Sequence, residues 1–247
     1  MVTRLRRLHR DQRRELPVDR GVQRARRGGR GLPRGAEAPV RHLRIDLSSG
    51  PGYLDSQLFN LVLPLLALVL AIGSGSKTLA GEEDDGRLEL TFSYPVRRRA
   101  AVVAKGLAVM VEVAMVAAVS FVAILGLGAV VNLDVSAERL AGALLGIWLL
   151  AVLHGMLSMT VCAVRPGRGL AIAVPSGFAA FGYLVNGLYA QASWLEPFRY
   201  LSSFWWLGQS PLSLGVEYDR FAVLAVAGLV ALAGAALLIE RRDLQVP

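Results

Sequence analysis

Five long apolar stretches fill this chain from about Leu58 to its end. A helix needs about 20 mostly apolar residues to cross roughly 30 Å of hydrocarbon. Only helices and closed barrels satisfy their backbone hydrogen bonds in lipid, and no stretch here alternates like a barrel strand. We therefore predict an all-α, polytopic membrane protein. Its five spans are expected at residues 56–76, 101–131, 140–164, 170–190 and 221–239.

The composition separates the chain into two parts. Hydrophobic residues make up 54% of the 247 residues and charged residues only 19%, which agrees with lipid as the main solvent. Residues 1–50 hold 14 arginines against five acids, whereas the rest of the chain holds 13 lysines and arginines against 14 acids. The expected organisation is thus an arginine-rich segment, 1–50, followed by a nearly neutral membrane domain, 51–247.

The basic residues after position 50 predict the orientation of the spans, because cytoplasmic loops carry an excess of lysine and arginine. Three of these 13 residues, Arg139, Arg199 and Arg220, fall on one side of the predicted bundle. The other ten lie on the opposite side, which we assign to the cytoplasm together with the C-terminus. They are Lys77, Arg87, Arg97, Arg98, Arg99, Lys105, Arg165, Arg168, Arg241 and Arg242.

The arginine-rich segment conflicts with this orientation. Five spans and a cytoplasmic C-terminus leave the N-terminus outside, which the same charge rule disfavours. A sixth span before residue 50 would resolve the conflict, but no apolar run exists there. Roughly half of residues 15–45 are Arg, Gly and Pro, which have GC-rich codons. One hypothesis is that a frameshift or an incorrect gene model replaces a first span; the alternative is a disordered basic arm that binds anionic lipid or nucleic acid.

The segment between the first two spans is the most informative polar sequence. Four consecutive acids follow Gly81, and a short sequence that can be helical runs from them toward Pro95. In such a helix Leu88 and Phe92 lie on one face, and the acids favour its N-terminus. We predict a short amphipathic helix parallel to the bilayer, with a charged face open to a cytoplasmic partner. An ordinary interfacial loop is the alternative.

This segment resembles a known family of transport proteins. The sequences Gly81–Leu90 and Ser93–Arg98 resemble a stretch of ATP-binding-cassette (ABC) exporter permeases of the type-two class, which includes NosY-like and drug-export permeases. Phe198–Trp205 and Glu240–Leu244 are similar to that family as well. The resemblance extends over about Pro51 to Val246. Members have six spans, so it implies that the first span here corresponds to the family's second.

The resemblance implies a multi-pass transport subunit of the plasma membrane that performs no chemistry itself. Two permease subunits, identical or different, would sit in the lipid above two cytosolic ATPases. ATP and Mg²⁺ would be bound by the ATPases, so this chain would need no cofactor, and no specific nucleic-acid partner is expected. Export, as in multidrug or antibiotic efflux, is the implied activity. The residues expected to couple permease and ATPase are Glu82, Glu83, Asp84, Asp85, Arg87, Leu88 and Phe92.

Two ionisable residues inside the spans are candidates for a translocation path. A charge within the bilayer costs at least about 2.5 kcal/mol on insertion scales, so Glu112 and His154 require explanation. Glu112 is expected near the membrane midplane, on a substrate path, paired with a basic group, or in a water-filled cavity. For His154 a buried, neutral side chain bonded to the backbone is the favoured interpretation. No second His, Cys or acid recurs at ligand spacing, and we predict no metal site.

Two further patterns concern packing. Residues 191–220 contain three of the four tryptophans, which predicts an interfacial or re-entrant helical hairpin at the outer mouth. Gly142 and Gly146 form a small-xxx-small pattern that allows close helix contact, and we favour packing within the subunit over a dimer seam.

Other functions are less well supported by the sequence. The sequence from Gly73 to Thr78 imitates a phosphate-binding loop, but Ala71 and Ser76 stand where that motif requires glycine. We therefore expect no ATPase activity in this chain. A membrane-embedded lipid-modifying enzyme would need clustered His, acid or Ser groups, and the chain has three histidines. A membrane anchor that binds nucleic acid or lipid through its basic arm is the remaining alternative.

The orientation can be tested by labelling. In a background in which Cys162, the single cysteine, is replaced by serine, Asp84→Cys should react with a membrane-impermeant maleimide only when the cytoplasmic face is accessible. Gln191→Cys, in the predicted external segment, should show the opposite behaviour. Labelling of the cysteine at position 84 in intact cells would contradict the predicted topology.

Overall fold

The computed structural model describes residues 54–82, 85, 97–130, 136–165, 167–208 and 211–241, all within one compact unit, Ile45–Pro247. Within these ranges the chain is helical and contains no strand, and five helices are long and apolar enough to cross a membrane. The predicted all-α bundle with five spans is therefore confirmed. The predicted N-terminal segment, 1–50, lies outside the described residues.

The first span is one continuous helix that changes its winding twice. It consists of the π-helical η2 (Asp55–Val62), α3 (Leu63–Ser76) and the π-helical η3 (Lys77–Gly81). The other spans are single α-helices, the last of which ends in a 3₁₀ turn. They are α6 (Arg98–Val130), α7 (Ala137–Val164), α8 (Arg168–Leu188), α11 (Tyr218–Leu238) and η5 (Ile239–Arg241).

The observed spans agree with the predicted ranges except at the end of the first. There the helix continues through Lys77–Gly81, which the sequence analysis assigned to a cytoplasmic loop. A charged residue and a terminal glycine look like a helix stop, but Leu79 and Ala80 are buried in the bundle and hold the last turn in place. Burial at this end therefore outweighs the local sequence preference.

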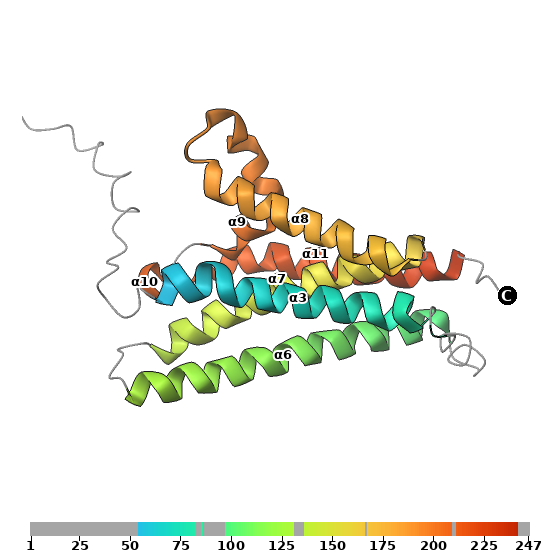
Figure 1. The fold of residues 1–247 in the computed structure, drawn as a ribbon, viewed down its shortest axis with the longest axis horizontal. Coiled ribbons are helices and arrows are strands. Elements are labelled where there is room, and N and C mark those ends of the chain that lie inside the picture. The colour runs from blue at the N-terminus through green and yellow to red at the C-terminus, as the bar shows by residue number, and fades with distance from the viewer. Residues whose placement is uncertain are drawn as a thin grey trace, which may run out of the picture. The chain divides into compact units, whose positions relative to one another are not determined.

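Successive spans run in opposite directions, so the segments predicted to be cytoplasmic meet at one end (Figure 1). The end of the first span, the start of α6, the turn between α7 and α8, and the end of α11 all lie toward the right of that view. The segment between α8 and α11 lies at the other end. It folds into η4 (Ser193–Leu201), α9 (Ser203–Leu207) and α10 (Pro211–Leu214), in agreement with the predicted helical hairpin. Which end faces the cytoplasm stays a prediction.

Helix α7 lies at the centre of the bundle and contacts the other four spans. In its most apolar stretch 72% of the residues are buried, compared with 11% in α6, which lies at the edge. Polar side chains on α7 donate hydrogen bonds to backbone carbonyls of all four neighbours. Trp148 donates to Met110 of α6 at 2.9 Å, and Thr160 to Ala231 of α11 at 2.8 Å. The single hydroxyl proton of Ser158 is shared between the carbonyl oxygens of Ala171 in α8, at 2.7 Å, and Ile72 in α3, at 3.3 Å.

The backbones of α3 and α7 touch where two glycines face each other. A Cβ atom added to Gly75 would lie 2.4 Å from the carbonyl oxygen of Gly155, and one added to Gly155 would lie 3.0 Å from that of Ala71. Small residues permit this approach, as they do in other membrane helix pairs. The contact fixes the first span against the central helix near the end predicted to be cytoplasmic.

The predicted role of Gly142 and Gly146 in packing within the subunit is confirmed. A Cβ atom on Gly142 would lie 2.8 Å from the hydroxyl of Tyr218, and one on Gly146 would lie 2.7 Å from the ring of Phe221. Both glycines therefore make room for the start of α11. Because these side chains fill the space beside the two glycines, another subunit cannot pack there.

The glycine contact gives a matched stability test. Gly75→Ala should lower the stability of the detergent-solubilised protein by about 1–3 kcal/mol, because the new methyl group collides with the backbone of Gly155. Gly73→Ala is the control, since a Cβ atom there has no neighbour within 4 Å. It should be neutral, or stabilising by up to about 1 kcal/mol through helix propensity. Equal unfolding midpoints for the two variants would contradict the close contact.

Candidate functional site

At the predicted cytoplasmic end, Lys105 of α6 binds the last turn of the first span. Its Nζ atom makes an ion pair with the carboxylate of Glu82 and donates a hydrogen bond of 2.9 Å to the carbonyl oxygen of Thr78. Only 15% of the Lys105 side chain and 30% of the Glu82 side chain are exposed. The ammonium group of Lys105 therefore connects Thr78, near the start of η3, to Glu82, the residue that follows η3.

The structure describes two of the predicted coupling residues, Glu82 and Asp85. Asp85 is exposed, and its backbone N–H donates to the carbonyl of Gly81 at 3.1 Å. The predicted amphipathic helix lies outside the described residues, as do Glu83, Asp84, Arg87, Leu88 and Phe92. The pairing of Glu82 with Lys105 was not foreseen, because Lys105 was counted only as a charge that sets topology. A lysine just inside the apolar part of a span, as Lys105 is, indicates that its charge needs a partner nearby.

A second ion pair connects α6 to the last span at the same end of the bundle. Arg99, in the first turn of α6, pairs with Glu240 of η5. The two side chains are 54% and 36% exposed, so this pair contributes little to stability by itself. Helix α6, which is weakly packed along most of its length, is thus attached to the first span and to the last at one end.

Glu112 is half-buried on α6, seven residues after Lys105. At 1.5 Å per residue it lies about 10 Å deeper along the helix. In the part of the chain that the structure describes, no basic group pairs with its carboxylate. The predicted alternative of an ion pair with another helix therefore has no support among these residues, and a path or a hydrated cavity stay as predictions.

His154 of α7 is completely buried. Its Nδ1 atom is 2.8 Å from the carbonyl oxygen of Leu150, and its Nε2 atom is 3.5 Å from the hydroxyl of Ser203. A carbonyl can only accept, so Nδ1 carries the proton and Nε2 can accept from the serine. The prediction of a buried, backbone-bonded histidine is confirmed. At this burial it does not line an open path in the present conformation.

Ser203 and its neighbour Ser202 hold the hairpin between α8 and α11 against the spans. Ser202 donates from Oγ to the carbonyl of Gly182 in α8 at 2.6 Å. The same oxygen accepts from the backbone N–H of Trp205 at 3.3 Å and so caps α9. The aromatic anchors are predicted by the sequence, whereas the role of these serines is not. The signal was a Ser-Ser pair directly before an aromatic run, where a helix cap is expected.

The aromatic residues of the hairpin pack into one cluster; its place at the membrane interface stays a prediction. The guanidinium of Arg220 lies 4.4 Å from the centre of the Trp205 ring, and the ring of Tyr200 packs edge-on against it at 5.0 Å. Arg199 donates to the hydroxyl of Tyr200 at 2.7 Å. Two of the three basic residues at this end therefore stack on aromatic faces.

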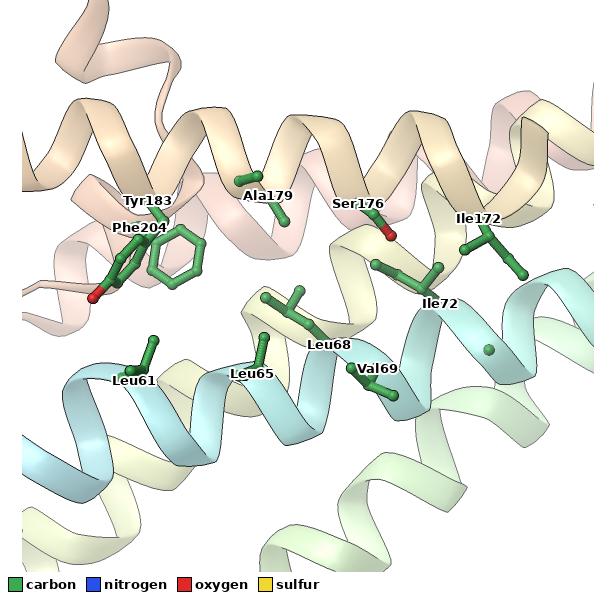
Figure 2. Close-up of a pocket in the computed structure, with 12 residues that line it drawn as sticks. Leu61, Leu65, Leu68, Val69, Ile72, Ile172, Ser176, Ala179, Tyr183 and Phe204 are labelled. Carbon is green, nitrogen blue, oxygen red and sulfur yellow. The ribbon is translucent and has the colours of Figure 1, made fainter. Parts of the chain in front are cut away.

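A cavity of about 450 Å³ lies between α3 and α8, a volume typical of small-molecule sites (Figure 2). Leu65 and Leu68 of α3 face Ser176 and Ala179 of α8 across it. No lining residue is charged, so the cavity could bind an apolar molecule. The lining residues are Leu61, Leu65, Leu68, Val69, Ile72, Gly73, Ile172, Ser176, Ala179, Ala180, Tyr183 and Phe204.

In the described ranges the phosphate-loop look-alike is part of a helix, and no cluster of metal-binding side chains forms. The segment that imitates a phosphate-binding loop is helical, and the hydroxyls of Ser76 and Thr78 donate to carbonyls of their own helix at 2.8 and 2.9 Å. These ranges contain no group of three or more His, Cys, Asp or Glu side chains placed to bind a metal ion.

Comparison with known proteins gives one match. The model of the ABC-2 family transporter proteins matches residues 35–244. This range includes every described helix and agrees with the resemblance found from the acidic segment. Searches of curated proteins and of solved structures found no significant match.

The hairpin anchor can be tested at Ser202. Ser202→Ala should destabilise the protein by about 1–2 kcal/mol, because it removes the cap of α9 and the bond to Gly182. It should also make the 191–210 region more sensitive to protease. Ser120→Ala is the control, since that hydroxyl donates only to Val116 of its own helix. Equal protease resistance of the two variants would contradict the anchoring role.

Proposed function

The chain belongs to the ABC-2 family of transporter proteins, and from this premise we propose that it is the permease subunit of an ABC exporter driven by a separate cytosolic ATPase. The family and the five apolar helices make it a multi-pass membrane subunit of an ABC transporter. The proposal adds the direction of transport, a cytoplasmic C-terminus and the place at which the ATPase attaches. That place is the acidic segment that follows Gly81.

The packing of η3 is the observation that supports this attachment site. Leu79 and Ala80 are only 2% and 1% exposed, and η3 contacts both α7 and α8. The acidic segment therefore leaves the bundle from a buried, rigid turn and not from a loose loop. A force applied to this segment by nucleotide-driven closure would reach the central helix directly. In this proposal Glu83, Asp84, Asp85 and Arg87 supply charged contacts, and Leu88 and Phe92 an apolar one.

A second permease subunit and lipid are the proposed neighbours of the exposed spans. Helix α6 presents a long apolar face, with Val111, Met115, Val119 and Val122 between 58% and 69% exposed. Such a surface is stable only in contact with hydrocarbon or with another apolar helix. We propose that two permease subunits, identical or different, complete the transport unit, and that lipid covers what remains.

The translocation path is assigned to the interior of this unit, with Glu112 as its candidate polar residue. Its carboxylate is half-buried and unpaired among the described residues. His154 is proposed to act on the path indirectly, because its bond to Ser203 connects the central helix to the external hairpin. Movement of α7 would in this way be transmitted to the hairpin that contains Ser203.

Co-purification tests the proposal. The wild-type chain, expressed with its candidate cytosolic ABC ATPase, should retain that ATPase on an affinity column. Glu83→Lys combined with Asp84→Lys should reduce the retained ATPase at least about tenfold while membrane insertion is unchanged, because reversal turns each attraction into repulsion.

The control reverses two acids at the opposite end of the bundle. Glu138→Lys combined with Asp219→Lys changes the net charge equally, at exposed positions in the first turns of α7 and α11. It should leave ATPase retention at the wild-type level. Retention that survives reversal at residues 83 and 84, or its loss in the control variant, would overturn the assigned attachment site.

A further inference from the structure

Glu82 differs from the acids that follow it, because its carboxylate is already bound. The ammonium of Lys105 pairs with one carboxylate oxygen, and both side chains are largely withdrawn from solvent. A basic group on an ATPase would have to displace Lys105 to reach Glu82. Displacement would leave a charge unpaired in a weakly polar setting, which is strongly unfavourable. Glu82 is thus poorly suited to be a contact with a partner.

Lys105 holds η3 from α6. Leu79 and Ala80 point into the core, while the ammonium reaches both the Thr78 carbonyl and the Glu82 carboxylate. An ammonium has three hydrogens, so it can satisfy both acceptors at once. The π-helical turn is in this way fixed between the core and α6, up to Glu82.

The pair also links the acidic segment to α6. Only 11% of the most apolar stretch of α6 is buried, although Val102, Val109 and Val113 near Lys105 pack into the core. The Glu82–Lys105 pair supplies a specific connection at the point where an ATPase would act. The Arg99–Glu240 pair continues it to the end of α11.

We propose that Glu82 and Lys105 are positioning residues for coupling, an inference that rests on the proposed function. Glu82 does not touch the ATPase. Its pairing with Lys105 holds the acidic segment at a fixed place relative to α6, so that closure of the ATPase moves the first span and α6 together. Loss of the pair leaves the ATPase bound but uncouples its hydrolysis from the permease.

The test uses the full chain in complex with its ATPase, reconstituted in lipid nanodiscs. Glu82→Gln and Lys105→Met should each retain the ATPase at the wild-type level. Each should reduce the permease-dependent stimulation of ATP hydrolysis at least about fivefold, as expected for removing one of two contacting charges. Lys105→Arg should keep most of the stimulation, because a guanidinium can also bind both acceptors.

A charge exchange separates pairing from direct contact. Glu82→Lys alone should lose stimulation, and its combination with Lys105→Glu should partly restore it. Restoration is incomplete because a carboxylate at position 105 cannot donate to the Thr78 carbonyl. If Glu82→Lys instead releases the ATPase and Lys105→Glu does not restore binding, Glu82 contacts the ATPase and the positioning role is overturned.

Unfolding of the permease alone tests the pair without the ATPase. Glu82→Gln and Lys105→Met should be non-additive in a double-mutant cycle of melting temperature, whereas additive shifts would show that the pair does not form. A non-additive cycle with normal stimulation would reduce the pair to a structural role and overturn the inference. If the wild-type chain retains no ATPase, the proposed function fails instead, and the cycle still reports on the pair.

Discussion

Hydrogen bonding inside a medium without water governs the arrangement of this bundle. Backbone groups are satisfied within each helix, so the polar side chains must find acceptors on other helices or on their own. Trp148, Ser158 and Thr160 all lie on α7 and donate to carbonyls of α3, α6, α8 and α11. Each bond is individually modest, on the order of 0.6–1.7 kcal/mol in membranes. Together they select α7 as the central helix and set its register against every neighbour.

The same constraint explains why the two ends of the bundle are built differently. At the end with the hairpin, Ser202 and Ser203 bring short helices into contact with α7 and α8, and arginines stack on aromatic rings. At the other end, ion pairs join the start of α6 to the end of the first span and to the end of the last. One end is fixed by buried serine hydroxyls and stacked arginines, and the other by two ion pairs between the ends of different spans.

The spans, their order and the family could be predicted from the sequence, because apolar length and the acidic motif are local properties. Contacts between distant residues could not. Gly75 was read only as part of a false phosphate-loop motif, although its missing side chain allows α3 to touch α7. Lys77–Gly81 was assigned to a loop because local preferences say nothing of the core that receives Leu79. Lys105 was counted as a topological charge, since its partner lies 23 residues earlier.

The length of α6 has a consequence for the surrounding membrane. From Gly106 to Val130 it contains 25 residues without a basic group, or about 37 Å of helix, against roughly 30 Å of hydrocarbon. An excess of this size is accommodated by inclination of the helix or by local thickening of the bilayer. Because most of this stretch is not held by protein packing, its inclination follows the lipids around it. Helix α6 therefore makes the subunit responsive to acyl-chain length, and a thin bilayer would pull on the Lys105 attachment more than a thick one.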